Sequence, residues 1–181
     1  QPGGRWRYLL ICFVVAAAVL NVVMWLVRGG SMAWQAAQSD WVVYLVLILI
    51  TSPLQAAAEE FFFRGYLQQA IGSLAGRAWV GILCSALVFA LFHGNQNIAL
   101  FAHRLGFGLI AGTLVWATGG LEAAIAVHVA NNVFAFGYAL FTGGVAALKA
   151  TSEISWEAAC SDLAGFAVFG AAAWWIGRRM H

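Results

Sequence analysis

The feature that most constrains this chain is a series of six long apolar segments, separated by short glycine-rich or polar breaks. An α-helix needs about 20 such residues to cross the hydrocarbon core of a bilayer, and each segment approaches that length. The segments are 8–27, 41–58, 78–92, 98–117, 121–141 and 158–176. The sequence therefore predicts an all-α fold, a polytopic membrane helical bundle of about six transmembrane helices.

The composition excludes the main alternatives to a membrane protein. Of the 181 residues, 63% are hydrophobic and 9% are charged, whereas roughly a quarter are charged in a soluble domain. Intrinsic disorder is excluded as well, because it requires low hydrophobicity and high charge. A net charge of +2 leaves no broad basic surface for nucleic acid. We expect an integral, multi-pass protein of a bacterial cell membrane, with the lipid bilayer as its first partner.

The basic residues predict the orientation of the bundle, because cytoplasmic ends of membrane helices are enriched in Lys and Arg. If the N-terminus is cytoplasmic, that side carries six arginines and the other side carries only Arg28 and Lys149. The six are Arg5, Arg7, Arg64, Arg77, Arg178 and Arg179. This distribution favours both termini in the cytoplasm.

Ionisable residues inside the apolar segments are the strongest functional signal, since each costs about 2.5–3.5 kcal/mol near the bilayer centre. The densest group runs from Glu59 to Arg64. Glu60 and Arg64 are spaced i, i+4 and can pair on one helix face, while Glu59 lies about 100° around the helix. A carboxylate beside such a pair suits a general base that takes a proton from water. The alternative is a solvated charge cluster at a helix end.

Two further helices carry polar side chains that could complete a hydrolytic site. His93 follows Phe89 by four residues, and His128 and Asn132 are also spaced i, i+4. An imidazole can orient water or bind a metal, and an amide can donate to an oxyanion. The rise of a helix puts Glu59, His93 and His128 about 18, 25 and 10 Å from the cytoplasmic ends of their helices. These depths disagree unless the helices tilt.

Other polar residues favour structural interpretations. Arg104 shares a helix face with Gly108 and Gly112, whose spacing is typical of close helix packing. Glu122 begins a predicted helix, where a carboxylate interacts favourably with the helix dipole. Taken singly, His93, His128 and Asn132 could also be packing residues between helices.

Three motifs, in order, resemble those of the CPBP (CAAX protease and bacteriocin-processing, or Abi) intramembrane endopeptidases. They are Glu59-Glu60-x-x-x-Arg64, Phe89-x-x-x-His93 and His128-x-x-x-Asn132. The resemblance covers a catalytic core over residues 47–136. It leaves an N-terminal segment, 1–46, and a C-terminal segment, 137–181, each with one transmembrane helix and no motif.

The resemblance implies a catalytic role for each motif residue. Glu59 would be the general base, Glu60 and Arg64 would hold and tune it, and His93 would help to activate water. His128 and Asn132 would stabilise the oxyanion. If a metal such as zinc is present, Glu59, His93 and His128 are the candidate ligands. The sequence has no H-E-x-x-H motif, and we favour a metal-free site that requires no cofactor.

The resemblance implies hydrolysis of a peptide or protein substrate that is itself anchored in the membrane. Two other functions compete with this one. A non-catalytic scaffold or bacteriocin-immunity partner would keep the same fold and bind another membrane protein. A small transporter or channel would also place Glu and His inside helices, although the sequence lacks the repeats common in transporters.

Overall fold

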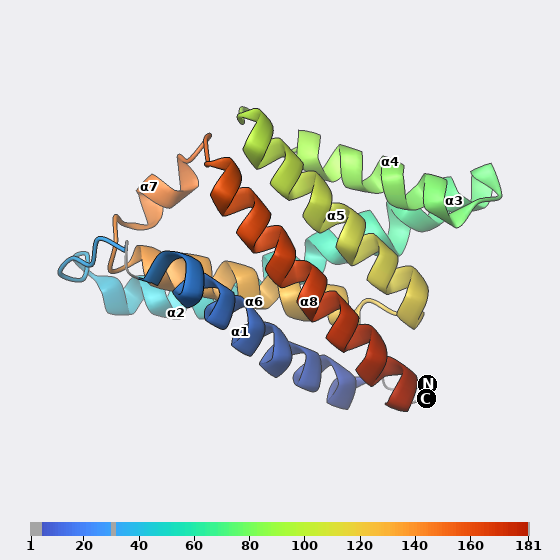
Figure 1. Ribbon diagram of the computed structural model, residues 1–181, viewed down its shortest axis with the longest axis horizontal. Helices are drawn as coiled ribbons and strands as arrows, with labels where there is room; N and C mark the ends of the chain where they lie inside the picture. Colours follow the sequence, from blue (N-terminus) through green and yellow to red (C-terminus); the bar gives the residue numbers. More distant parts are fainter. Residues whose placement is uncertain (1–4, 30–31, 181) are drawn as a thin grey trace.

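The computed structural model describes residues 5–29 and 32–180, and this part of the chain is helical without any strand. Residues 1–4, 30–31 and 181, which belong to the two flanking segments, lie outside the description. In chain order the elements are α1 (Trp6–Arg28), α2 (Trp41–Glu60), η2 (Phe61–Leu67), α3 (Gln68–Ala75), α4 (Ala78–Leu91), α5 (Ile98–Thr118), α6 (Glu122–Ala139), α7 (Val145–Lys149) and α8 (Trp156–Met180) (Figure 1). The predicted all-α bundle is confirmed.

Four helical segments of the described chain are long and apolar enough to cross a membrane. They are α1, the continuous helix Trp41–Ala75 formed by α2, η2 and α3, and the helices α5 and α8. Two more of the predicted membrane helices form but are not among these four. Helix α4 has only 14 residues, and helix α6 has 18 residues and carries polar side chains. The second helix extends past the apolar segment that ends at residue 58, as the depth of about 18 Å estimated for Glu59 assumed, and reaches Ala75. The short helix α7 was not predicted.

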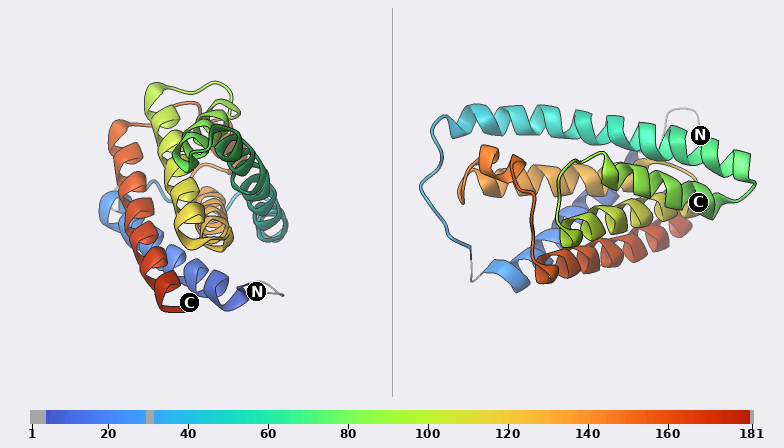
Figure 2. Two further views of the ribbon diagram at one scale, coloured as in Figure 1. Left: turned by 90° about the vertical axis from the view of Figure 1, so that its right-hand side faces the viewer. Right: turned by 90° about the horizontal axis from the view of Figure 1, so that it is seen from above.

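Helix α6 lies at the centre of the bundle and packs against α1, α2 and α5 (Figure 2). Its inner faces are made of small residues, including Ala123, Ala124, Ala126 and Ala130, all of which are buried. Small side chains let neighbouring backbones approach closely, which is how helices associate inside lipid. The alanine-rich sequence of α6 therefore places it at the core, where its polar residues face other helices.

Glycines bring α3, α4 and α5 into equally close contact. A Cβ atom at Gly81 of α4 would lie 2.2 Å from the backbone oxygen of Gln68, and one at Gly108 of α5 would lie 2.9 Å from the Cβ atom of Ala86. At the helix ends, Gly76 and Gly119 have positive φ angles of 63° and 68°, which favour glycine and terminate α3 and α5. The predicted close packing at Gly108 is confirmed.

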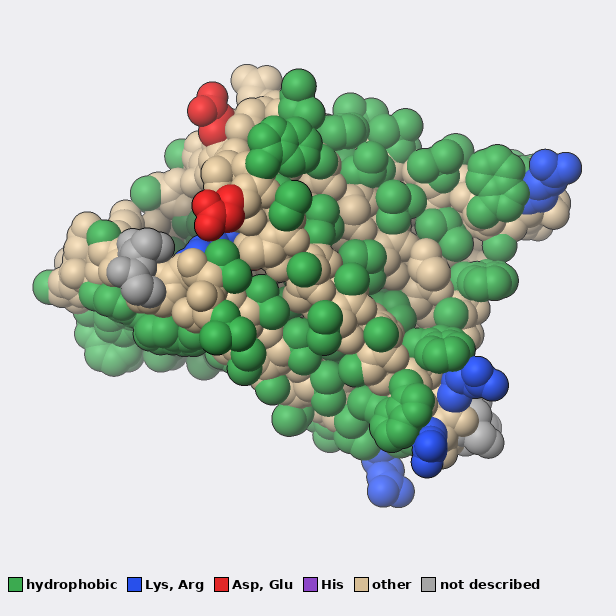
Figure 3. All heavy atoms as spheres, viewed as in Figure 1, with side chains coloured by type: hydrophobic (Ala, Val, Ile, Leu, Met, Phe, Trp, Pro, Cys, Tyr) green, Lys and Arg blue, Asp and Glu red, His purple; other side chains and the backbone are tan. Residues whose placement is uncertain are grey.

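Many hydrophobic side chains are exposed on the face of the bundle shown in Figure 3, as expected for a protein that is integral to a membrane. Leu26 on α1, for example, is 81% exposed. Basic side chains gather at one end, where α1 begins, α3 meets α4 and α8 ends (Figures 1 and 3). This end carries Arg5, Arg7, Arg77, Arg178 and Arg179. The clustering is what the predicted orientation requires, and the orientation itself stays a prediction.

Candidate functional site

The predicted Glu60–Arg64 ion pair forms at the junction of α2 and η2, and both side chains are completely buried (0% exposed). The Nη1 group of Arg64 donates a hydrogen bond of 2.9 Å to Oε1 of Glu60. The guanidinium carbon lies 4.4 Å from the ring centre of Phe89 and 5.6 Å from that of Phe107. Aromatic faces attract a cation electrostatically. The two rings and Glu60 therefore stabilise the Arg64 guanidinium, whose burial in an apolar environment would otherwise be costly.

Arg64 lies in a π-helical turn, η2, that interrupts the long second helix. Its wider turn is joined to α4 by Ser85, whose Oγ donates a hydrogen bond of 2.7 Å to the backbone oxygen of Phe63. Single π-turns inside α-helices often occur at functional sites. No residue pattern in the sequence indicated this turn.

His128 of α6 completes the buried cluster from the other side. Its Nδ1 atom lies 2.7 Å from Oε1 of Glu60, the same oxygen that accepts from Arg64. A carboxylate can only accept a hydrogen bond, so Nδ1 carries the proton. The Nε2 atom lies 3.8 Å from Oε2 of Glu59. Glu60 therefore fixes the tautomer of His128 and directs its second nitrogen toward Glu59.

Glu59 has a different environment from its neighbour. Its side chain is 24% exposed and lines a cavity of about 310 Å³, here named the central cavity. Oε1 of Glu59 accepts a hydrogen bond of 2.9 Å from Nε2 of Gln55. Gln55 was not identified from the sequence, although its spacing of four residues before Glu59 was a usable signal.

His93 lies in the turn beyond the end of α4. Its Nδ1 atom donates a hydrogen bond of 2.7 Å to the backbone oxygen of Phe89, so Nε2 keeps a lone pair. Burial lowers the pKa of His93, and this effect outweighs the hydrogen bond to Phe89, which raises it. The imidazole is therefore favoured in its neutral form, which can accept a hydrogen bond from water.

The central cavity brings together the site residues that the sequence placed at different depths. Glu59, His93, His128 and Asn132 all line it, while Glu60 and Arg64 lie buried behind its wall. The depth estimate assumed parallel helices, but the helices cross obliquely (Figure 1). His93 also lies beyond the last residue of α4, Leu91. The tilt that the depth estimate left open is present, and the residues converge on one cavity.

The remaining polar residues at the cavity have mainly structural contacts. Oδ1 of Asn132 accepts a hydrogen bond of 3.2 Å from the side chain of Asn131, which leaves the Asn132 amide nitrogen as a donor. Nη1 of Arg104 donates 2.7 Å to the side chain of Gln96 and 3.5 Å to the backbone oxygen of His93. Arg104 thus supports the turn that carries His93, in agreement with its structural interpretation.

The candidate zinc ligands do not form a recognisable metal centre. Across residues 5–29 and 32–180, no three His, Cys, Asp or Glu side chains are grouped as metal ligands would be. The Nδ1 atoms of His93 and His128 are held by Phe89 and Glu60, which leaves Nε2 as the free ring nitrogen of each. The metal-free site stays a prediction.

Comparison with known proteins identifies one family. Residues 40–134, slightly more than half of the chain, match the family described as type II CAAX prenyl endopeptidase Rce1-like. The uncharacterized protein YyaK of Bacillus subtilis (strain 168) is 29% identical over 142 residues, which cover 72% of this chain and 47% of YyaK. The chain thus spans about half the length of this curated relative. No solved structure matches the chain.

Proposed function

Because the chain belongs to the type II CAAX prenyl endopeptidase Rce1-like family, we propose that it is an intramembrane endopeptidase. It hydrolyses a peptide bond in a peptide or protein substrate that is anchored in the membrane. One observation carries the proposal. The carboxylate of Glu59 and Nε2 of His128 lie 3.8 Å apart at the wall of the central cavity, a separation that leaves both groups able to reach the same water-sized site.

In the first step, Glu59 takes a proton from a water molecule in the central cavity. The oxygen of that water attacks the carbonyl carbon of the scissile bond. His93 orients the water through Nε2, because its Nδ1 proton is used in the hydrogen bond to Phe89. Gln55 holds the Glu59 carboxylate in place, so the base is positioned before the substrate arrives.

The tetrahedral oxyanion that results is stabilised by His128 and Asn132. Asn132 donates from its amide nitrogen. Glu59 passes the proton taken from water to Nε2 of His128, 3.8 Å away, and Nε2 then donates it in a hydrogen bond to the oxyanion. The Glu60 carboxylate, 2.7 Å from Nδ1, holds the ring in place during this transfer. Removing a single donor from such a site typically lowers kcat by about 100- to 1000-fold. Arg64 balances the negative charge of Glu60 and, through its hydrogen bond, holds the Glu60 side chain in position.

Collapse of the intermediate completes the reaction. The carbon–nitrogen bond breaks, and the proton held by Nε2 of His128 passes to the departing nitrogen. The products are a new carboxyl group and a new amine, and both Glu59 and His128 are back in their starting forms. Every proton moves between water, the substrate and side chains of this chain. The proposed site therefore requires no cofactor.

The test is cleavage of a membrane-anchored peptide by purified protein in detergent or liposomes. Glu59→Gln keeps the shape of the side chain and removes the base, and we expect at least about a 100-fold loss of activity. Glu157→Gln, at an exposed position on α8, is the matched control and should retain activity. If Glu59→Gln cleaves the substrate as fast as the unmodified chain, the mechanism is wrong and a non-catalytic scaffold becomes the better interpretation.

A further inference from the structure

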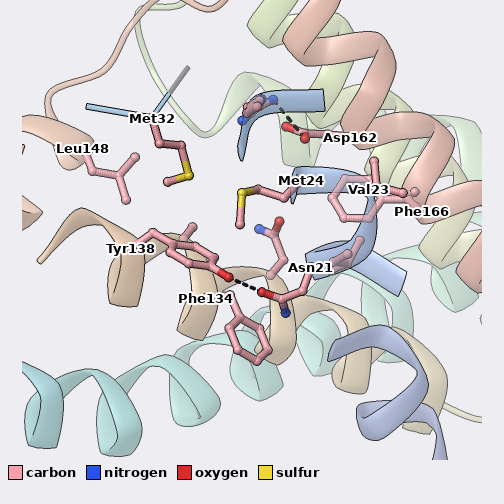
Figure 4. A pocket seen from close by; sticks show the side chains of 14 residues that line it. Asn21, Val23, Met24, Met32, Phe134, Tyr138, Leu148, Asp162 and Phe166 are labelled. Carbon is pink, nitrogen blue, oxygen red and sulfur yellow. Dashed lines mark hydrogen bonds and ion pairs between the residues drawn. The ribbon is translucent and has the colours of Figure 1, made fainter. Parts of the chain in front are cut away.

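A second cavity adjoins the central cavity and has no role in the mechanism above. This cavity, here named the side cavity, has a volume of about 210 Å³ and lies between α1, α6 and α8 (Figure 4). Four residues line both cavities: Asn131, Ala135, Leu148 and Phe166. The side cavity therefore lies directly beside the site where peptide hydrolysis is proposed to occur, and the two share part of one wall.

The walls of the side cavity suit an apolar side chain of variable shape. The sulfur-containing side chains of Met24 and Met32 face the same space as Leu148 (Figure 4). Methionine is unbranched and polarisable, so it adapts to irregular apolar groups. A volume of 210 Å³ corresponds to about seven water molecules in the liquid. This is room for one large side chain and the backbone that carries it.

Polar groups at the edge of the side cavity distinguish it from a lipid groove. The hydroxyl group of Tyr138 donates to Oδ1 of Asn21, and Nη2 of Arg28 donates 2.9 Å to Oδ1 of Asp162. The other carboxylate oxygen of Asp162 lies 3.5 Å from Nε2 of His103, which lines the central cavity. These paired groups give the side cavity a polar edge beside its apolar wall. A peptide, which carries both apolar side chains and a polar backbone, matches this mixture better than an alkyl chain does.

Another groove on the bundle has the features expected of a site for a lipid chain. It lies between α1, α2 and α6, has a volume of about 530 Å³ and is lined by side chains such as Leu9, Phe13 and Ile125. This groove shares no lining residue with the central cavity. The side cavity differs from this groove in two respects: its lining is partly polar, and it shares four lining residues with the central cavity.

We propose that the side cavity is a specificity subsite that takes a large apolar side chain flanking the scissile bond of an extended peptide substrate. This inference rests on the proposed function, since the scissile bond must lie in the central cavity. Met24 of α1 sets the size of the side chain that fits. Because Met24 lies outside residues 40–134, which match the family, specificity would reside in a part of the chain that carries no motif.

The test changes the size of Met24 in both directions. The probe is a library of fluorogenic peptides in which one position at a time is Ala, Leu or Trp on a constant Ser/Asn background. Met24→Trp should shift kcat/KM toward the smaller side chain by about tenfold, and Met24→Ala should shift it toward the larger one. Leu26→Trp adds the same ring on the same helix at an 81% exposed position and should leave the preference unchanged. If both Met24 variants lower the cleavage of every peptide alike, the residue is structural and the subsite is disproved.

A second measurement is independent of cleavage. A photoreactive benzoylphenylalanine at position 24 in the Glu59→Gln background should cross-link to library peptides with large apolar residues, and the same group at position 26 should not. Cross-links to lipid alone, or none at all, would overturn the subsite. Peptide cross-links at position 24 without cleavage by the unmodified chain would keep the subsite and reject the proposed hydrolysis.

Discussion

Nδ1 of His128 lies 2.7 Å from Oε1 of Glu60, although 68 residues separate them in the chain. The same oxygen accepts a hydrogen bond from Arg64. One carboxylate oxygen thus joins α6 to the π-turn that follows α2. Removing its charge should affect both the stability of the bundle and the orientation of His128.

Glu60→Gln is expected to destabilise the protein strongly, because it leaves the Arg64 guanidinium buried without a counter-charge. Breaking a buried pair from one side typically costs about 3–5 kcal/mol. Thermal unfolding in detergent measures the effect, with Glu157→Gln as the exposed control. An unchanged unfolding temperature would contradict the stabilising role of the Glu60–Arg64 pair.

Phe89→Leu should weaken both the buried cation and the turn that carries His93. The ring centre lies 4.4 Å from the Arg64 guanidinium carbon and 4.7 Å from the ring centre of His93. Loss of a desolvated cation–π contact alone accounts for about 2 kcal/mol. Phe92→Leu, at a side chain that is 75% exposed, is the control. Equal unfolding temperatures for the two variants would contradict this role of Phe89.

Gly81→Ala should separate α4 from α3, because the new Cβ atom would lie 2.2 Å from the backbone oxygen of Gln68. Backbone atoms cannot move aside as a flexible side chain can. Overpacking of this kind typically costs about 1–3 kcal/mol. Gly137→Ala is the matched control, since a Cβ atom there meets nothing within 4 Å. Similar stability of the two variants would disprove the close contact.

The ion pair between Arg5 and Glu122 should make stability depend on pH. Burial acts to raise the pKa of Glu122, but the hydrogen bonds and charge of Arg5 outweigh it and hold that pKa below the ordinary value of 4.5. The folded state therefore gains stability above pH 4.5 and loses it as the pH falls through the lower, folded-state pKa.

Because the Arg5–Glu122 pair is partly exposed, the gain should be about 0.5–1 kcal/mol. Unfolding temperatures of the unmodified chain and of Glu122→Gln, measured from neutral pH downward, check this expectation. The difference between the two proteins should shrink as the solution becomes acidic. A constant difference would show that the pair does not titrate as described.

Metal chelation is expected to leave peptide cleavage unchanged. No group of three potential metal ligands occurs among the residues that the structure describes, and the proposed mechanism uses only side chains of the chain. Activity before and after treatment with EDTA and 1,10-phenanthroline measures this directly. Inactivation that is reversed by added zinc would replace the metal-free mechanism with a metal-dependent one.

The sequence predicted what depends on spacing within one helix and missed what depends on how helices cross. The i, i+4 spacing correctly predicted the pairing of Glu60 with Arg64, and the apolar segments correctly predicted the long helices. Neither pattern predicts the angle at which α6 crosses the second helix, and this angle brings His128 to Glu60. The π-turn has no residue signature, and Phe107 is one of 13 phenylalanines with nothing to distinguish it. The boundaries of the core and the catalytic roles stay predictions.

The i, i+4 pairing of Glu60 and Arg64 also bears on how the protein is made. Membrane helices enter the bilayer before they associate with one another, so the second helix must enter before α6 can supply His128. An isolated charge would oppose this entry. A partner one turn away neutralises the charge within the entering segment itself. The Glu60–Arg64 pair therefore forms before the second helix enters the membrane. The buried cluster is completed only when α6 packs against that helix and His128 contacts Glu60.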